Sequence, residues 1–134
     1  MLTKWLIYRE YAVRPDDLDA SGAVEPSVVS GWLEEIRADY LAHCPLLSAL
    51  GTPEARTIGP GPVLDALDGV AVTATAAEVQ PTAVTLSLRI RTAERAFNAR
   101  SVIRMLDRDG QAVELGKAVR DELIALEHSA AHYN

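Results

Sequence analysis

Residues 17–41 read DLDASGAVEPSVVSGWLEEIRADYL and contain the two signals that decide the fold. The first part is polar and rich in aspartate, with a glycine, a composition typical of tight turns. The second part begins at Pro26, and proline is favoured in the first turn of a helix. From there apolar residues recur at helical spacing, which predicts one long, largely buried helix that ends before Pro45. The stripe consists of Val29, Leu33, Ile36 and Tyr40, widened by Val28 and Trp32.

Strand patterns lie on both sides of this predicted helix. Residues 3–13 mix aromatic and β-branched side chains with charged ones, which favours a first strand. Residues 84–91 alternate strictly between apolar and polar side chains, the pattern of a strand with one buried face. Residues 70–79 and 97–105 alternate in the same way and predict two more strands.

The connections indicate how these strands pair. Gln80-Pro81-Thr82 is a reversal short enough to make its two flanking strands antiparallel neighbours, and Asp109-Gly110 supplies another turn. Residues 51–63 are rich in glycine and proline and are expected to form a loop inside the domain. Residues 117–127 carry apolar positions at helical spacing and predict a short closing helix.

These elements fit a single domain spanning residues 1–134. The order of strand, helix and several strands predicts an α+β domain in which a curved antiparallel sheet is wrapped round one long central helix. A short C-terminal helix completes it. Because such a sheet is covered on one face only, its other face and its edges need a partner, and we expect a homodimer or homotetramer.

Composition excludes several classes of protein. The formal net charge of -6 argues against nucleic acid as a partner, because duplex binding depends on cations that neutralise phosphates. No apolar run approaches the roughly 20 residues that cross a bilayer, so we expect a cytoplasmic protein without membrane contact. A lone cysteine, Cys44, and three scattered histidines give no metal-site spacing, and we expect neither a metal nor another cofactor.

One basic stretch stands out in this acidic chain. Residues 89–108 contain six arginines. These arginines form either the solvated face of a sheet or a site for a phosphorylated ligand. They are Arg89, Arg91, Arg95, Arg100, Arg104 and Arg108.

The acidic turn before the predicted helix also has two interpretations. Aspartates favour turns, and negative charge is stabilised near a helix N-terminus, so the segment could be purely structural. The order of a carboxylate, a glycine and the amides of a helix start could instead hold and polarise a carbonyl group.

At this segment the chain resembles the hotdog-fold acyl-CoA thioesterases related to 4-hydroxybenzoyl-CoA thioesterase. Residues 17–24 are similar to the Asp-x-Asp-x-x-Gly-x-Val signature of that family. Residues 32–37, WLEEIR, match its aromatic, hydrophobic and acidic run along the central helix. The likeness in motif covers residues 14–41, and the order of elements agrees over the whole chain. It implies a hotdog fold and a thioester hydrolase that acts on acyl-CoA or an acyl-carrier protein.

Carried over position by position, the resemblance implies that Asp19 is the catalytic carboxylate, as nucleophile or general base. Pro26 departs from the family, in which a backbone amide at the helix start polarises the thioester carbonyl, because proline has no N–H. Neighbouring amides would have to substitute for it. The substrate-binding positions are then Gly22, Ala23, Val24, Pro26 and Ser27, with Glu25 between them.

Other charged residues are candidates for a role. Glu25 could act as an acid and, as a second carboxylate near Asp19, would raise the pKa of one of the two. Glu34 could be catalytic, since one hotdog branch uses a helix glutamate, or could pair with Arg37 on the helix surface. Glu35 is the weaker of these two helix candidates. The phosphates of coenzyme A could be bound by Arg89 and Arg91.

Three alternatives remain open at this point. A hotdog protein could bind an acyl thioester without hydrolysing it, which Pro26 favours. It could be a biosynthetic enzyme that releases a polyketide-type product or dehydrates a substrate, although residues 19–30 lack the histidine typical of dehydratases. A purely structural dimer module is favoured if Asp19 is buried and ion-paired.

Overall fold

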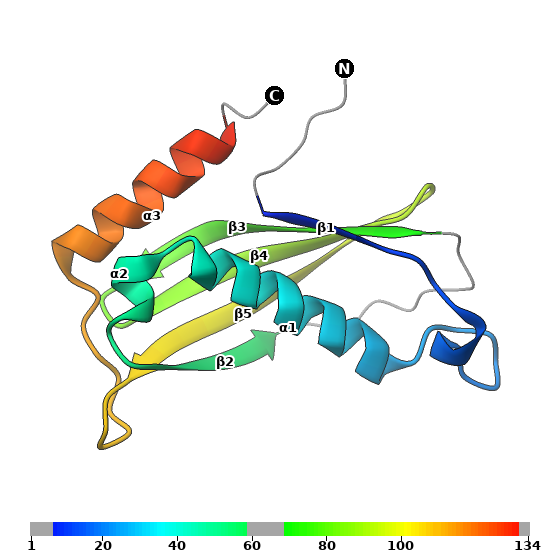
Figure 1. The fold of residues 1–134 in the computed structure, drawn as a ribbon, viewed down its shortest axis with the longest axis horizontal. Helices are drawn as coiled ribbons and strands as arrows, with labels where there is room; N and C mark the ends of the chain where they lie inside the picture. The colour runs from blue at the N-terminus through cyan, green and yellow to red at the C-terminus, as the bar shows by residue number, and fades with distance from the viewer. Residues whose placement is uncertain (1–6, 59–68, 132–134) are drawn as a thin grey trace.

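A computed structural model describes residues 7–58 and 69–131 of the chain. The elements run in the order strand, helices, four strands and a helix (Figure 1). Their bounds are β1 Tyr8–Tyr11, the 3-10 helix η1 Pro15–Asp17, α1 Pro26–Ala42, α2 Pro45–Ser48, β2 Thr52–Ile58, β3 Val70–Gln80, β4 Ala83–Arg91, β5 Ala96–Leu106 and α3 Gly116–Ala131.

The strands form one antiparallel sheet with the order β1-β3-β4-β5-β2. The sheet is curved, and the long helix α1 crosses one of its faces (Figure 1). The predicted α+β architecture, a curved sheet around one long helix, is therefore confirmed. We call the face toward α1 the inner face and the opposite one the outer face.

The alternating sequence patterns correspond to the inner and outer faces. The predicted strands at 70–79, 84–91 and 97–105 are β3, β4 and β5, each within two residues of its expected bounds. On β4, Leu86, Leu88 and Ile90 are fully buried, while the two arginines that alternate with them are exposed. The turn at Pro81 and Thr82 makes β3 and β4 antiparallel neighbours, as predicted.

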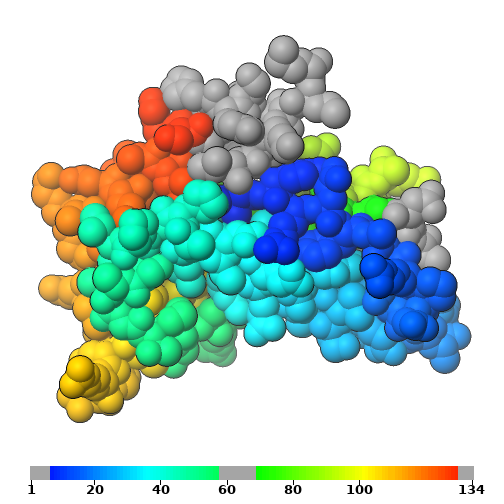
Figure 2. Space-filling model, viewed as in Figure 1, coloured from blue at the N-terminus to red at the C-terminus, as the bar shows by residue number. Residues whose placement is uncertain are grey.

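The core lies between the inner face and α1. The predicted stripe of α1 is buried, and Ile36 and Tyr40 have no exposed surface. Burying one such side chain contributes about 1.5–3 kcal/mol to folding. On the β1 side, Trp32 stacks on Tyr11 with ring centroids 5.0 Å apart. These contacts fix the helix against the first strand, and Figure 2 shows α1 across the middle of this face of the molecule.

The prediction of a loop over residues 51–63 is wrong for its first part. Thr52–Ile58 form β2, which pairs with β5 along its whole length. β2 is an edge strand, and an edge tolerates Pro53 because only one side of the strand forms ladder hydrogen bonds. Gly51 precedes the strand because a Cβ there would lie 2.1 Å from the backbone oxygen of Leu106. Residues 59–68 lie outside the described residues.

The closing helix α3 is longer than the predicted span of 117–127. Two carboxylates on α3 fix its position against the other helices. The Tyr40 hydroxyl donates a hydrogen bond to Glu127 at 2.7 Å. Glu122 accepts hydrogen bonds from the backbone N–H groups of Leu46 and Leu47 at 2.9 and 3.1 Å, which caps α2. The three α-helices thus pack against one another.

Two further observations complete the fold. The first strand is shorter in the described residues than the predicted 3–13, because β1 covers Tyr8–Tyr11 and residues 1–6 lie outside the described part. Among the helices of the described part, none has the length and apolar character needed to span a membrane.

Candidate functional site

Asp19 lies in a tight loop between η1 and α1. The loop is closed by an antiparallel bridge between Leu18 and Val24, and the Asp19 N–H donates to the Ala23 carbonyl oxygen at 2.7 Å. The chain reverses at Gly22, whose φ of 87° is in the left-handed region that favours glycine. The Gly22 N–H donates to the Asp19 carbonyl oxygen at 3.1 Å. The glycine of the acidic turn is therefore required by the backbone.

The Asp19 carboxylate accepts three hydrogen bonds, all on Oδ1. The donors are the Ser21 hydroxyl at 2.6 Å, the Ser21 N–H at 2.8 Å and the Ala23 N–H at 3.1 Å. The pKa of Asp19 is lowered, mainly by the Ser21 hydroxyl and then by the Ser21 N–H, while desolvation opposes the shift. Asp19 is therefore ionised at neutral pH, and its side chain is partly exposed.

This geometry limits what Asp19 can do. An ionised, partly exposed carboxylate can attack an electrophilic carbon or accept a proton from water. Because Oδ1 is engaged in the turn, Oδ2 is the oxygen that would react. A lowered pKa makes the group a weaker base, since proton transfer is most efficient when the pKa is near the working pH.

The start of α1 determines which backbone donors are left for a substrate. Pro26 is the first helical residue, as predicted, and the N-cap residue is Glu25, whose carbonyl oxygen accepts from the N–H groups of Val28 and Val29 at 3.0 and 3.3 Å. Ser27, at the second helical position, is exposed, and its N–H donates no hydrogen bond to another described residue.

The other predicted amide donors are largely used within the loop. The N–H groups of Gly22 and Ala23 bond to Asp19, and the N–H of Glu25 donates to the Asp17 carbonyl oxygen at 2.7 Å. The Val24 N–H makes no hydrogen bond within the described residues, but the Val24 side chain is buried. Ser27 is thus the predicted position that combines an exposed residue with an uncommitted N–H.

The expected coupling between Glu25 and Asp19 is not found. A nearby carboxylate would raise the pKa of Asp19, whereas that pKa is lowered and Glu25 is not among the causes. Glu25 is partly buried at the N-cap, and its side chain forms no capping hydrogen bond. The main-chain carbonyl of Glu25, and not its side chain, accepts the first hydrogen bonds of the helix.

Glu34 and Glu35 lie on α1, away from its start. Glu34 is about 12 Å along the helix axis from Pro26, at a rise of about 1.5 Å per residue. Its side chain is 73% exposed and lies 3.9 Å from the Arg37 guanidinium, the predicted surface pair. Glu35 accepts a hydrogen bond from Arg9 of β1 at 2.8 Å. The structure therefore does not bring these glutamates into the Asp19 loop.

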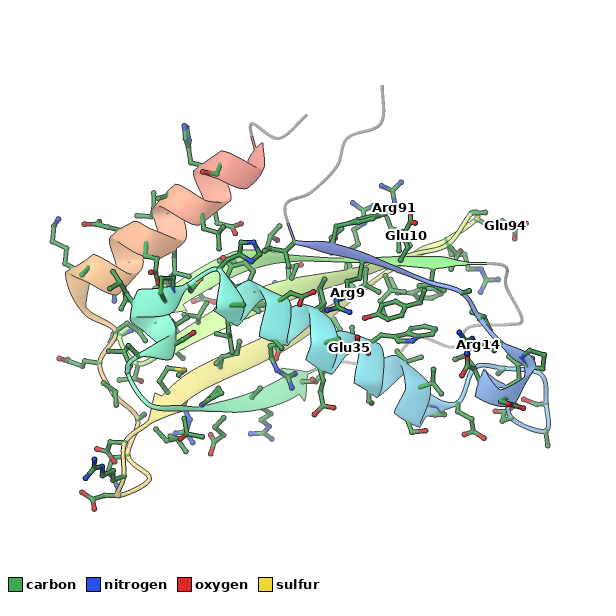
Figure 3. The ribbon with its side chains drawn as sticks, viewed as in Figure 1. Arg9, Glu10, Arg14, Glu35, Arg91 and Glu94 are labelled. Atoms are coloured by element: carbon green, nitrogen blue, oxygen red, sulfur yellow. The ribbon has the colours of Figure 1, made fainter. Side chains whose placement is uncertain are left out.

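Sequence reasoning missed two contacts around this region. Arg9 also pairs with Asp39, and this pairing lowers the pKa of Asp39. Figure 3 shows Arg9 and Glu35 facing each other between β1 and α1. No local signal could have found a pair separated by 30 residues. Ser21 was in the quoted motif, and a serine two residues after an aspartate is a recognisable partner for an Asx-type turn.

Arg89 and Arg91 lie on the outer face of β4, as their alternation predicts, and both are exposed. Arg91 pairs in register with Ala71, which pairs in turn with Glu10 of β1. Figure 3 shows Arg91 and Glu10 together, apart from the contact between Arg9 and Glu35. Within one chain, the two arginines are thus on the opposite side of the sheet from α1.

No group of three or more histidine, cysteine, aspartate or glutamate side chains within residues 7–58 and 69–131 is arranged to hold a metal ion. The expected absence of a metal stays a prediction for the chain as a whole.

Comparison with known proteins places this geometry in context. No protein-family model matches the chain, and no curated protein matches it significantly. Solved structures do match. A thioesterase from Thermus thermophilus, complexed with coenzyme A and Zn, has a TM-score of 0.73 at 20% identity, over 92% of this chain and 96% of that one.

Two other solved structures have the same architecture. The probable thioesterase YbaW from Escherichia coli has a TM-score of 0.68 at 18% identity, over 90% of this chain and 98% of that one. The hexameric thioesterase y2039 from Yersinia pestis has a TM-score of 0.63 at 14% identity, over 87% of this chain and 100% of that one. At these identities the likeness establishes the fold.

The chain has the hotdog fold, and the resemblance seen in residues 14–41 is confirmed at that level.

Proposed function

We propose that this chain is a thioester hydrolase that acts on an acyl group carried by coenzyme A or by an acyl-carrier protein. The observation that carries the proposal is the ionised, partly exposed carboxylate of Asp19, held in a loop directly before the long helix of a hotdog fold. Solved structures with this fold that are named thioesterases, one of them complexed with coenzyme A, support it.

Asp19 would act through Oδ2 in one of two ways. As a nucleophile, Oδ2 bonds to the thioester carbonyl carbon, the carbon–sulfur bond breaks, and the thiolate leaves. Water then cleaves the resulting anhydride, which restores the carboxylate and supplies a proton to the thiolate. As a general base, Asp19 would take a proton from water while that water attacks the same carbon; the carbon–sulfur bond then breaks, and the proton passes from Asp19 to the leaving thiolate.

The carbonyl oxygen of the substrate needs a hydrogen-bond donor near Asp19. In this proposal the Ser27 N–H takes that role, since Pro26 has no N–H and the amides of Gly22, Ala23 and Glu25 are committed. A donor at the start of a helix also benefits from the positive end of the helix dipole. Val24 and Pro26 would then form part of the wall around the acyl group.

A homodimer, or a larger assembly built from it, belongs to the same proposal. Described β2 residues on both faces of the strand are exposed, including Ala55 and Thr57 on its inner face. An exposed edge strand with a bare inner face is suited to a second copy. The hexameric state named for the Yersinia pestis protein supports assembly in this fold. Solution mass by light scattering tests it, and a monomer at micromolar concentration would contradict it.

A non-hydrolytic acyl-thioester binder is the second candidate, because Pro26 removes the family's carbonyl-polarising amide. One experiment separates the two functions. Thiol release is measured with coenzyme A esters of short, long and aromatic acyl groups, and binding of the same esters is measured by calorimetry. Release with at least one ester supports the hydrolase. Binding without release across the panel would contradict the hydrolase and support the acyl-thioester binder. Thiol release by the Glu34→Gln variant tests separately whether Glu34 is the reacting carboxylate.

A further inference from the structure

Four arginines form a diagonal stripe across the outer face of the sheet. Arg89 and Arg91 are two residues apart on β4 and therefore point to the same face. Arg89 pairs in register with Asn98, so Arg100 of β5 is its diagonal neighbour. Val102 pairs with Arg56 of β2, so Arg56 is in turn diagonal to Arg100. We call Arg91, Arg89, Arg100 and Arg56 the arginine stripe.

The side chains of the stripe have no ion-pair partner within residues 7–58 and 69–131. All four are exposed. Arg104, which is on β5 in register with Glu54 of β2, differs. Arg104 donates a hydrogen bond from Nε to Glu54 at 2.9 Å, so its charge is compensated. Among the described residues, the stripe is therefore a group of guanidinium groups without an ion-pair partner, next to an arginine that has one.

The size of the stripe suggests a large partner. Residues two apart on one strand, such as Arg91 and Arg89, lie about 7 Å apart, and diagonal neighbours in an antiparallel sheet lie about 7–8 Å apart, so the three steps from Arg91 to Arg56 cover roughly 20 Å. That length exceeds what one phosphate group can contact and is comparable to the charged side of a helix of about 13 residues. An extended acidic surface would match it, because each arginine could reach a separate carboxylate.

We propose that the arginine stripe is the docking surface for an acidic carrier protein, which brings the acyl thioester on its pantetheine arm. This inference rests on the proposed function and specifies the substrate carrier within it. Charge complementarity is its basis, since four exposed arginines, none of them ion-paired within the described part of the chain, are gathered on the sheet face opposite α1 in a chain with a net charge of -6. Complementary patches of this kind speed association and select partners.

The position of the stripe fits delivery of the arm to the Asp19 loop. Arg91 is in register, through Ala71, with Glu10, which is one residue before the end of β1. From that end the chain runs into η1 and the Asp19 loop. The stripe therefore begins at the end of the sheet from which this loop emerges, and it extends from there across β5 to β2.

Direct binding tests the proposal without requiring catalysis. A fluorescently labelled acidic acyl-carrier protein is titrated with the purified protein, and the Kd is compared for wild type, Arg100→Glu and Arg108→Glu. Both variants change the net charge equally, and Arg108 lies in the exposed turn after β5. We expect Kd to rise about tenfold or more for Arg100→Glu and to stay within about twofold for Arg108→Glu. Wild-type binding should weaken as salt rises from about 0.05 to about 0.3 M.

Several outcomes would overturn the proposal. One is a wild type that does not bind the carrier protein, and another is an equal loss of binding in both variants. A third is a change of oligomeric state in Arg100→Glu alone, which would assign the stripe to a second copy of this chain. A fourth is an equal fall in the kcat/KM of Arg100→Glu with octanoyl-CoA and with octanoyl carrier protein. That result would mean that the arginine stripe binds the phosphates of coenzyme A.

The same set of proteins separates this proposal from the proposed function. Stripe-dependent binding of the carrier protein with no thiol release from any ester would contradict the hydrolase and leave the docking surface standing. Thiol release from coenzyme A esters without stripe-dependent binding would contradict the docking surface alone. Hydrolysis of an uncharged octanoyl-N-acetylcysteamine thioester reports the chemistry independently of either charged carrier.

Discussion

Ser21 donates two hydrogen bonds to the same carboxylate oxygen of Asp19, one from its hydroxyl at 2.6 Å and one from its backbone N–H at 2.8 Å. Both bonds favour the ionised form, so the pKa of Asp19 is below the ordinary value of 3.8. The same bonds fix Oδ1 in the turn and leave Oδ2 to react. Ser21 thus stabilises the charge of the proposed catalytic group and helps to fix its orientation.

Replacing Ser21 by alanine should move the acid limb of the pH profile. The carboxylate is active when ionised, so kcat/KM is lost as pH falls through the lowered pKa of Asp19. Without the hydroxyl, that pKa rises toward 3.8, and the acid limb moves to higher pH. The profile is measured by thiol release, with Ser30→Ala on the exposed side of α1 as control. An unchanged acid limb in Ser21→Ala would show that Asp19 does not control the rate.

Two glycine substitutions should have opposite effects on stability. Gly22→Ala places a side chain at a φ of 87° and should lower the free energy of unfolding by about 1 kcal/mol. Gly31→Ala lies inside α1 with open space around the new methyl group and should raise it by about 0.5–1 kcal/mol. Urea denaturation measures both. Equal stabilisation by the two alanines would mean that the Asp19 loop does not adopt this conformation.

The hydrogen bond from Tyr40 to Glu127 should contribute to the docking of α3. Tyr40 has no exposed surface, and Tyr40→Phe leaves the partly buried Glu127 carboxylate without this donor, at a cost of about 1–2 kcal/mol in unfolding free energy. Tyr8→Phe removes the same atom where the hydroxyl bonds to the exposed Glu10, and should cost under about 0.5 kcal/mol. Urea denaturation compares the pair. If the two variants lose equal stability, the α3 contact is not formed as described.

Cys44 should be unreactive in the folded protein. It is the sole cysteine, it has no exposed surface, and burial raises its pKa to about 12. At pH 8 the thiolate fraction is then on the order of one part in 10⁴, and the thiolate is the reactive form. An aromatic disulfide reagent should label Cys44 only after unfolding in urea. Rapid labelling of the native protein would contradict the packing between α1 and α2.

Much of the fold could be predicted because the strongest patterns are local. The alternation of Leu86, Leu88 and Ile90 with polar residues follows directly from a strand with one buried face. β2 was missed because the glycines and prolines of residues 51–63, Pro53 among them, give the whole segment the composition of a loop. Only the order of the whole sheet shows that this strand lies at an edge, where proline is tolerated.

The site was predictable in type but not in detail. The motif indicated a carboxylate before a helix, and Asp19 does lie there, partly exposed. Which backbone N–H groups form hydrogen bonds within the loop depends on its three-dimensional conformation. The Ala23 N–H bonds to Asp19 and the Ser27 N–H does not, and the sequence alone does not indicate this difference. The contact between Arg9 and Asp39 joins residues 30 positions apart and has no sequence signal.

The most direct test of the account is the rate of thiol release by Asp19→Asn beside Asp16→Asn. Asparagine keeps an oxygen that can accept the hydrogen bonds from Ser21 and Ala23, so the loop is preserved while the charge is lost. Asp16 is exposed in η1 and provides the same chemical change outside the loop. We predict that kcat/KM falls about 10²-fold or more for Asp19→Asn and less than about twofold for Asp16→Asn. Full wild-type rate in Asp19→Asn would contradict the assignment of Asp19 as the reacting carboxylate.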